Sequence, residues 1–268
     1  IASLKPSAIR EVLKATSVPG MIPFAAGNPA PDAFPVAEVQ EIAAEILKNR
    51  PIDALQYGVT EGYPELISLI KTRMKSKYGI GRDFDSIIIT SGAQQVMDLS
   101  TKVLCNEGDV VICESPSFIG SLNCFRSYNA KLVGVPVDAD GMNIEALEKA
   151  LDENPNAKMI YTIPNFQNPA GVTMSLEKRR KLYELAKAHN VMILEDNPYG
   201  DLRVAGEDVP NIKSFDEDGI VIYSGSFSKI LAPGIRIGFT VAPATVVAKM
   251  TVGKQAVDVP VSYTHLRA

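Results

Sequence analysis

The stretch from Met159 to Leu194, MIYTIPNFQNPAGVTMSLEKRRKLYELAKAHNVMIL, contains the repeating unit that decides the fold. It begins and ends with an apolar run, and neither run alternates between apolar and polar residues. Such runs are typical of strands covered on both faces. Between them, Ser175 can cap a helix whose apolar face carries Leu182 and Leu185. A strand, a helix and a second strand in this order predict two parallel strands of one sheet.

The same pattern extends on both sides of this stretch. Further strands are predicted at 87–90, 110–113, 132–135 and 220–223, with helix-period segments between them. The chain is therefore predicted to be an α/β protein with a mostly parallel sheet sandwiched by helices. The first 80 residues differ, because a proline- and glycine-rich arm precedes two amphipathic helices near 36–46 and 64–74.

Composition narrows the possible functions. The 268 residues are 46% apolar and 22% charged, which is ordinary for a globular protein. The net charge of −4 argues against a nucleic-acid surface and against polybasic membrane contact. No apolar run approaches the ~20 residues that a membrane span needs, and no secretory leader is expected. Two histidines are too few for most zinc or Ser-His-Asp sites, so no metal is expected.

The three cysteines suggest a compartment. Cys105, Cys113 and Cys124 are odd in number and have no Cys-x-x-Cys spacing. This usage fits reduced thiols better than a disulfide framework, so a cytoplasmic location is expected.

Polar clusters follow four of the predicted strands, at the sheet edge where ligands bind in folds of this kind. The first, Ser91, Gly92, Ala93 and Gln94, opens a helix, where backbone N–H groups and the helix dipole favour an anion. The second surrounds Asn168, whose amide can donate to an oxyanion. Each has a plain structural alternative, a serine helix cap for the first and an Asn-Pro turn for the second.

The other two clusters carry charged side chains. Asp196 follows a buried strand, where a carboxylate is costly unless it faces a cation such as a protonated ring nitrogen, and Tyr199 could reach a neighbouring oxygen. Lys229 follows another strand, and lysine is the side chain that forms Schiff bases. Arg236, seven residues later, offers a planar fork for phosphate. The alternatives are a capped turn with a surface aspartate and an exposed loop lysine. Taken together, the four clusters point to one cofactor, pyridoxal 5′-phosphate.

With these residues in place, the sequence resembles the class I/II aminotransferases, pyridoxal-phosphate enzymes of fold type I, over about residues 7–258. The resemblance implies that Lys229 carries the cofactor as a Schiff base and that Asp196 keeps its ring nitrogen protonated. Asn168 and Tyr199 would contact the phenolic oxygen. Contacts to the phosphate are implied for Ser91, Gly92, Ala93, Gln94, Ser226, Ser228 and Arg236.

Two aromatic residues complete the implied cofactor site. Phe118 matches the aromatic side chain that stacks on the ring, although many relatives have tyrosine there. Tyr57 matches a tyrosine that reaches the phosphate of the neighbouring subunit, so a homodimer is implied.

The implied reaction moves an amino group from an L-amino acid to a 2-oxo acid. Segments 6–14 and 24–29 resemble the 2-aminoadipate/broad-specificity branch, whose members act on 2-aminoadipate, aromatic or branched-chain amino acids. In that branch Arg10 would read a distal substrate carboxylate, unless it is an ordinary helix-surface arginine. Gly27 and Asn168 would line the substrate pocket. No nucleic-acid partner is implied.

Two other functions stay open. One is a different fold type I activity, such as a lyase or decarboxylase, which would use the same Lys229 and Asp196. The other is the aminotransferase-like domain of a transcriptional regulator, which would carry a winged-helix segment upstream.

The resemblance also implies a division of the chain. We expect an N-terminal arm with helices (1–80), a cofactor-binding large domain (81–258) and a non-native tail (259–268) in place of a smaller C-terminal domain. Such a fragment is expected to bind cofactor but to transaminate poorly.

Overall fold

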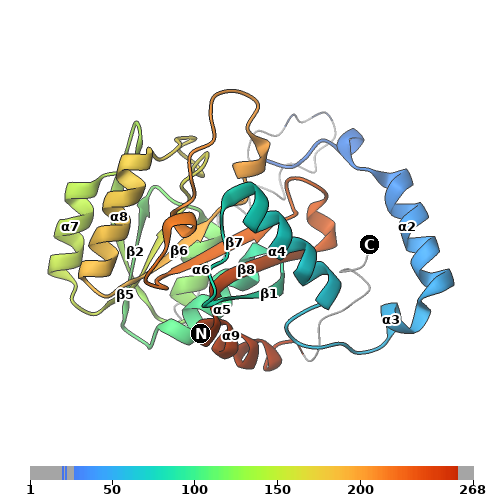
Figure 1. Ribbon diagram of the computed structural model, residues 1–268. Coiled ribbons are helices and arrows are strands. Elements are labelled where there is room, and N and C mark those ends of the chain that lie inside the picture. The colour runs from blue at the N-terminus through green and yellow to red at the C-terminus, as the bar shows by residue number, and fades with distance from the viewer. Residues whose placement is uncertain (1–19, 21, 23–26, 259–268) are drawn as a thin grey trace. The chain divides into compact units, whose positions relative to one another are not determined.

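The computed structural model describes residue 20, residue 22 and residues 27–258 (Figure 1). Arg10 and the tail 259–268, both subjects of predictions above, lie outside the described residues. The chain divides into two compact units, the first ending at Phe34 and the second beginning at Pro35. The described part of the first unit contains one 3-10 helix, η1 (Pro31–Ala33). The elements below all belong to the second unit.

An eight-stranded sheet forms the centre of the second unit, in the order β1-β8-β7-β6-β5-β2-β3-β4. Strands β7, β6, β5, β2 and β3 are parallel, β8 is antiparallel to both of its neighbours, and β4 is antiparallel to β3. The mostly parallel sheet is therefore confirmed, but β8 was not predicted. The strand bounds are β1 (Asp85–Ser91), β2 (Val110–Ser115), β3 (Lys131–Asp138), β4 (Gly141–Met142), β5 (Ala157–Thr162), β6 (Met192–Asp196), β7 (Val221–Ser226) and β8 (Ile237–Pro243).

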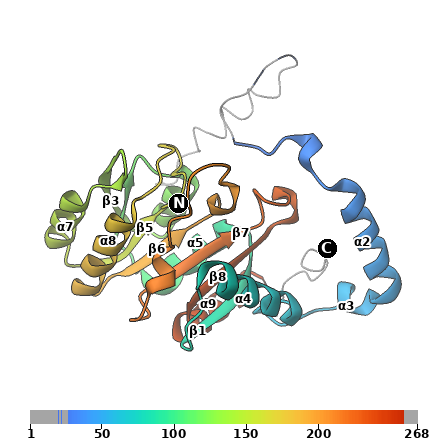
Figure 2. The ribbon, with the colours of Figure 1, turned by 45° about the horizontal axis from the view of Figure 1, so that its top comes forward.

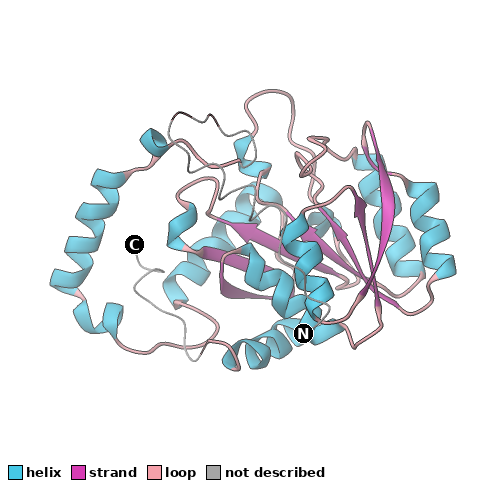
Figure 3. Cartoon of the chain, turned by 180° about the vertical axis from the view of Figure 1, so that it is seen from behind, coloured by secondary structure: helices cyan, strands magenta, loops and turns pink. Residues whose placement is uncertain are grey.

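Helices lie on both sides of the strand layer, as Figure 3 shows from behind. The helix bounds are α2 (Val36–Asn49), α3 (Pro51–Leu55), α4 (Pro64–Tyr78), α5 (Ala93–Leu104), α6 (Ile119–Ser127), α7 (Ile144–Glu153), α8 (Leu176–Ala188) and α9 (Ala244–Gln255). Short 3-10 helices are η2 (Gly200–Leu202), η3 (Ile212–Phe215) and η4 (Pro233–Ile235). Ser175 accepts a hydrogen bond from the backbone N–H of Lys178, which confirms the cap predicted for α8.

Two apolar layers hold the helices to the sheet. Because side chains of a strand alternate between its faces, Ile88 packs with α5 and α9 while its neighbour Ile89 packs with α4 on the other face. Helices α7 and α8, which lie side by side in Figures 1 and 2, cover the strands β2, β5 and β6 from the α4 side. The core therefore fixes the sheet from both faces, which is what a site built at its edge requires.

A buried ion cluster ties β1 to the segment before β7. The Lys213 ammonium donates to Asp85 at 2.7 Å and to Asp216 at 2.8 Å, and all three side chains are almost wholly buried. Two buried carboxylates thus share one buried cation.

We expect Lys213→Met to lower the free energy of unfolding by about 3–5 kcal/mol, because it leaves two buried carboxylates without their cation. Urea unfolding followed by circular dichroism measures the change. Lys149→Met is the matched control, since Lys149 forms an exposed pair with Glu153 at 3.8 Å and its loss should cost less than about 0.5 kcal/mol. Equal losses in the two variants would contradict the assigned role.

Candidate active site

The topology brings the predicted clusters to one edge of the sheet. Strand β8 is antiparallel to β1 and to β7, so β1 runs in the same direction as the parallel strands. The carboxyl ends of β1, β7, β6, β5 and β2 therefore meet at one edge, and β8 begins there. The register confirms this, because Ser91 at the end of β1 pairs with Ile237, and Ser226 at the end of β7 pairs with Gly238.

The start of α5 forms a cradle with Arg236. The guanidinium donates to the Ser91 carbonyl oxygen at 3.1 Å and to the Pro233 carbonyl oxygen at 3.2 Å. Gly92, the N-cap of α5, has φ +73°, and a Cβ built on it would lie 2.4 Å from the guanidinium. The positive φ favours glycine at this position, and the missing side chain lets the guanidinium lie close to the backbone. The first turn of α5 carries no acidic residue, so its N-terminus and the guanidinium favour an anion together.

Lys229 lies in the turn that follows β7. In this turn the Ser226 hydroxyl accepts a hydrogen bond from the backbone N–H of Ser228 at 3.1 Å. The ring of Phe239 presses on the end of β7, since a Cβ on Gly225 would lie 2.3 Å from it. The lysine side chain is half-buried, and this burial lowers the pKa of its ammonium. A lower pKa makes the free, nucleophilic amine easier to reach at neutral pH.

Asp196 ends β6 as a buried carboxylate, 4% exposed. The Tyr161 hydroxyl donates to Oδ2 at 3.0 Å, and the Ser224 hydroxyl donates to Oδ1 at 3.1 Å. Burial raises the pKa of Asp196 to about 6, although both hydrogen bonds oppose the rise. A cation placed against this carboxylate would therefore be bound firmly.

Asn168 and Tyr199 meet, as expected for two residues that share a ligand oxygen. The Asn168 amide donates to the Tyr199 hydroxyl at 3.1 Å, and the Asn168–Pro169 peptide bond is cis. Burial raises the pKa of the tyrosine, so its hydroxyl keeps its proton at neutral pH and can donate it.

Gln167 and Glu114 hold the loop that carries Asn168, and sequence reasoning missed both. The Gln167 amide donates to Glu114 at 3.0 Å and to the Pro116 carbonyl oxygen at 2.9 Å. Glu114 is almost fully buried, and burial raises its pKa to about 7. These bonds join the loop after β5 to the loop after β2, which leads to Phe118.

Phe118, which precedes α6, and Gln94, in the first turn of α5, meet at Gly120 in the first turn of α6. A Cβ on Gly120 would come within 2.6 Å of the Phe118 ring and 3.1 Å of the Gln94 amide oxygen. The Gln94 amide also donates to the Gly120 carbonyl oxygen at 3.1 Å. The aromatic ring predicted to stack on a cofactor is thus next to the predicted anion cradle.

The other predicted residues are Tyr57, Gly27 and Arg10. Tyr57, in the connection between α3 and α4, is 82% exposed. Gly27 belongs to the first compact unit, and Arg10 lies outside the described residues.

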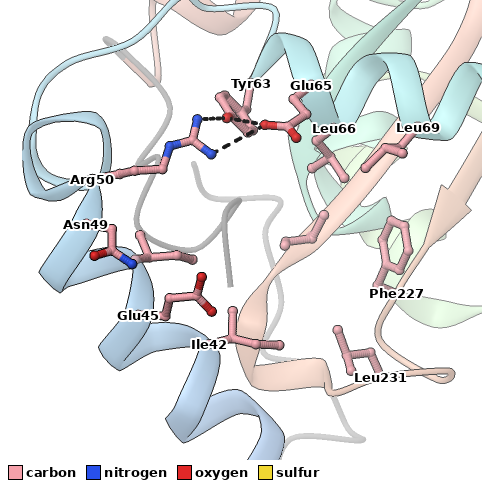
Figure 4. Close-up of a pocket in the computed structure, with 12 residues that line it drawn as sticks. Ile42, Glu45, Asn49, Arg50, Tyr63, Glu65, Leu66, Leu69, Phe227 and Leu231 are labelled. Carbon is pink, nitrogen blue, oxygen red and sulfur yellow. Dashed lines mark hydrogen bonds and ion pairs between the residues drawn. The ribbon is translucent and has the colours of Figure 1, made fainter.

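A separate cavity of about 430 Å³ opens beside the lysine turn (Figure 4). None of the residues predicted to bind a cofactor lines it. Helix α2, confirmed as a helix, has no buried residue, and its Ile42 and Ile46 face this space. The lining residues are Ile42, Glu45, Ile46, Asn49, Arg50, Tyr63, Glu65, Leu66, Leu69, Phe227, Leu231 and Ile237.

Among the described residues, no group of three histidine, cysteine, aspartate or glutamate side chains is placed to hold a metal ion. None of the helices that the structure describes is long and apolar enough to cross a membrane.

Comparison with known proteins gives the family. A family model described as "Aminotransferase class I and II" matches residues 19–264. The chain belongs to the class I and II aminotransferases. The resemblance predicted from the sequence is thereby confirmed, and so is the fold type I architecture.

Three relatives of this aminotransferase chain are informative. It is 44% identical over 259 residues to aromatic-amino-acid aminotransferase 1 of Thermococcus litoralis, covering 95% of this chain and 62% of the relative. It is 36% identical over 258 residues to the 2-aminoadipate transaminase of Thermus thermophilus, covering 95% and 63%. The solved kynurenine aminotransferase of Pyrococcus horikoshii, in complex with PMP, superimposes with a TM-score of 0.94 at 39% identity, covering 99% of this chain and 67% of that chain. The chain thus spans just over three fifths of the length of these curated relatives.

Proposed function

We propose that this chain is the cofactor-binding part of a pyridoxal-phosphate-dependent aminotransferase, which moves an amino group from an L-amino acid to a 2-oxo acid. One observation carries the proposal. Among the described residues, the buried Asp196 carboxylate accepts side-chain hydrogen bonds only from neutral hydroxyl groups. It ends a strand at the same sheet edge as Lys229. Family membership supports the same function.

The residues at this edge fit the cofactor. A Cβ at position 92 would collide with the Arg236 guanidinium, so glycine lets this cation lie against the first turn of α5, where a phosphate group can be bound. We assign the ring nitrogen to Asp196, the phenolic oxygen to Asn168 and Tyr199, the ring face to Phe118, and the covalent bond to Lys229. The assigned phosphate contacts are Ser91, Gly92, Ala93, Gln94, Ser226, Ser228 and Arg236.

When bound, pyridoxal phosphate supplies an electron sink for the negative charge that develops at the substrate Cα. The chain's own residues do the rest. Lys229 Nζ, as a free amine, would take the proton from the substrate Cα as a general base and would later return a proton as a general acid. Asp196 would hold a compensating negative charge against the protonated ring nitrogen, and the Tyr199 hydroxyl would donate to the phenolic oxygen.

The substrates proposed are 2-aminoadipate, aromatic or branched-chain amino acids, each with a 2-oxo acid as acceptor. Two relatives support this range, since one is named for aromatic amino acids and the other for 2-aminoadipate. Arg10 is assigned to a distal substrate carboxylate, and Gly27 and Asn168 to the pocket wall. A cytoplasmic location is supported by three free thiols.

A homodimer is part of the proposal. Large apolar side chains are exposed along α3 and the connection to α4, at Ile52, Leu55, Tyr57 and Val59. A second copy of the chain would cover such a surface and bring Tyr57 to its neighbour's phosphate site.

The test of this function is whether product formation depends on an acceptor. With pyridoxal phosphate equimolar to the chain, we expect 2-aminoadipate or an aromatic amino acid to give more than one 2-oxo acid per cofactor only when a second 2-oxo acid is added. Without acceptor, the amino group stays on the cofactor after one turnover. Chromatography of both products measures this, and each should appear in equal amount. Product in excess of the cofactor without acceptor would instead support a lyase or decarboxylase. Cofactor binding with no turnover would support a regulator domain.

A further inference from the structure

Four buried side chains form a continuous hydrogen-bonded row across four elements. Ser121 of α6 donates to the Tyr161 hydroxyl oxygen at 2.9 Å, and Tyr161 of β5 donates to Asp196 of β6 at 3.0 Å. Ser224 of β7 donates to the other carboxylate oxygen at 3.1 Å. Ser121, Tyr161 and Ser224 are each 0% exposed.

The direction of these bonds follows from the chemistry of the groups. An ionised carboxylate can only accept hydrogen bonds, so the Tyr161 hydroxyl must be the donor in its bond to Asp196. The tyrosine oxygen then accepts the proton of Ser121. The Tyr161 ring is fixed by an edge-on contact with Phe125, their centroids 5.3 Å apart and their planes at 72°. Phe125 and Ser121 both belong to α6, so one helix sets both the ring and its hydroxyl.

We propose that Tyr161 is a positioning residue of the active site, which orients the Asp196 carboxylate and keeps it ionised. The proposal rests on the proposed function in so far as Asp196 pairs with the ring nitrogen. Through Ser121, the same row ties Asp196 to the helix that begins directly after Phe118. The two side chains assigned to the ring nitrogen and to the ring face are thereby held at a fixed separation.

The surroundings of Asp196 explain why a neutral donor matters here. Burial raises the pKa of this carboxyl, and its donors among the described residues are hydroxyls. The other titratable groups whose charge acts on it are Glu114, which disfavours a second negative charge, and Tyr199, which stays neutral at pH 7. Tyr161 and Ser224 are therefore the groups that oppose protonation, because a hydrogen bond to the charged form lowers the pKa.

The first test measures the Asp196 carboxyl in the cofactor-free chain. Aspartate labelled with carbon-13 at the carboxyl group gives one resonance for Asp196, assigned by its loss in Asp196→Asn. In the unaltered chain we expect it to titrate near pH 6. Tyr161→Phe should move the midpoint upward by about one pH unit or more. Tyr128→Phe is the matched control, because the Tyr128 hydroxyl donates to a different carboxylate, Asp98, at 2.7 Å.

An unchanged Asp196 midpoint in Tyr161→Phe, or an equal shift in Tyr128→Phe, would overturn the proposal. If Tyr161→Phe fails to fold because Ser121 is left without an acceptor, the double variant Ser121→Ala/Tyr161→Phe removes both groups and should show the same upward shift.

The second test is a double-mutant cycle on cofactor affinity, measured by calorimetry with pyridoxal phosphate. Tyr161→Phe should weaken binding about tenfold or more in the unaltered chain and have little effect in an Asp196→Asn background. Equal losses in both backgrounds would show that Tyr161 does not act through Asp196, which refutes the proposal. A chain that takes up no pyridoxal phosphate would refute the proposed function, while the carbon-13 titration would still decide the role of Tyr161.

Discussion

Replacing Lys229 with alanine is expected to abolish the visible absorbance that pyridoxal phosphate gives on binding to the chain and to reduce turnover by at least about 10³-fold. The reason is that one amine performs two tasks in the proposed mechanism. It binds the cofactor covalently, and it moves the proton at the substrate Cα, a step that alone contributes about 10²–10⁴-fold. Absorbance spectra of the two proteins with equimolar pyridoxal phosphate measure the first loss, and product assays measure the second.

Lys254→Met is the matched control for this experiment. Lys254 is also buried, and burial lowers the pKa of its ammonium to about 8, so by acidity alone it is a candidate nucleophile. Its Nζ, however, donates to the Thr60 carbonyl oxygen at 2.9 Å and lies 3.9 Å from the Asp258 carboxylate. We expect Lys254→Met to keep the visible absorbance. Loss of the visible absorbance in Lys254→Met together with its retention in Lys229→Ala would refute the assignment of Lys229.

Replacing Asp196 with asparagine is expected to lower cofactor affinity and turnover by about 10²–10³-fold. Removing one partner of a buried charge pair costs about 3–5 kcal/mol, and 1.4 kcal/mol corresponds to a factor of ten. The matched control is Asp98→Asn, which removes a carboxylate that accepts from Tyr128 and is not assigned to the cofactor. The control should leave both quantities unchanged.

The pH dependence of cofactor affinity gives the same prediction a second readout. The pKa of Asp196 is about 6 without a cation, and pairing with a protonated ring nitrogen must lower it further. Affinity should therefore be full above pH 6 and fall as the pH drops below 6, because cofactor binding then requires loss of the carboxyl proton. In Asp196→Asn this dependence should disappear. A fall of the same size in that variant would show that another group is responsible.

Much of the fold could be predicted because its strands are buried on both faces and its helix caps are local. Ser175 illustrates this, since its capping role depends on residues within one turn. Strand β8 was missed because its first residues were interpreted as part of the Lys229–Arg236 phosphate segment. Its position between β1 and β7 depends partly on pairing with β1, more than 100 positions away, which no local pattern reveals.

The site was predicted less completely than the fold. Residues that differ from their surroundings, such as Asp196 after an apolar strand, stood out in the sequence. Tyr161 did not, because a tyrosine inside an apolar strand is indistinguishable from an ordinary core residue. Only the pairing of β5 with β6 places its hydroxyl beside the carboxylate. Ser224 and Glu114 were missed for the same reason, since each acquires its role from neighbouring strands.

Helix α2 shows the limit of reading burial from periodicity. Its apolar residues repeat with helical spacing, and the helix forms as predicted, yet none of its residues is buried. A hydrophobic stripe predicts that a helix needs a partner surface, but the stripe does not say which part of an assembly supplies it.

The most direct test of the account is borohydride reduction of the chain loaded with pyridoxal phosphate, followed by protease digestion and mass spectrometry of the peptides. Reduction makes an imine bond permanent, so the modified residue can be located. The account predicts one pyridoxyl group on Lys229 and none on Lys254. A pyridoxyl group on any other lysine with position 229 unmodified would contradict it.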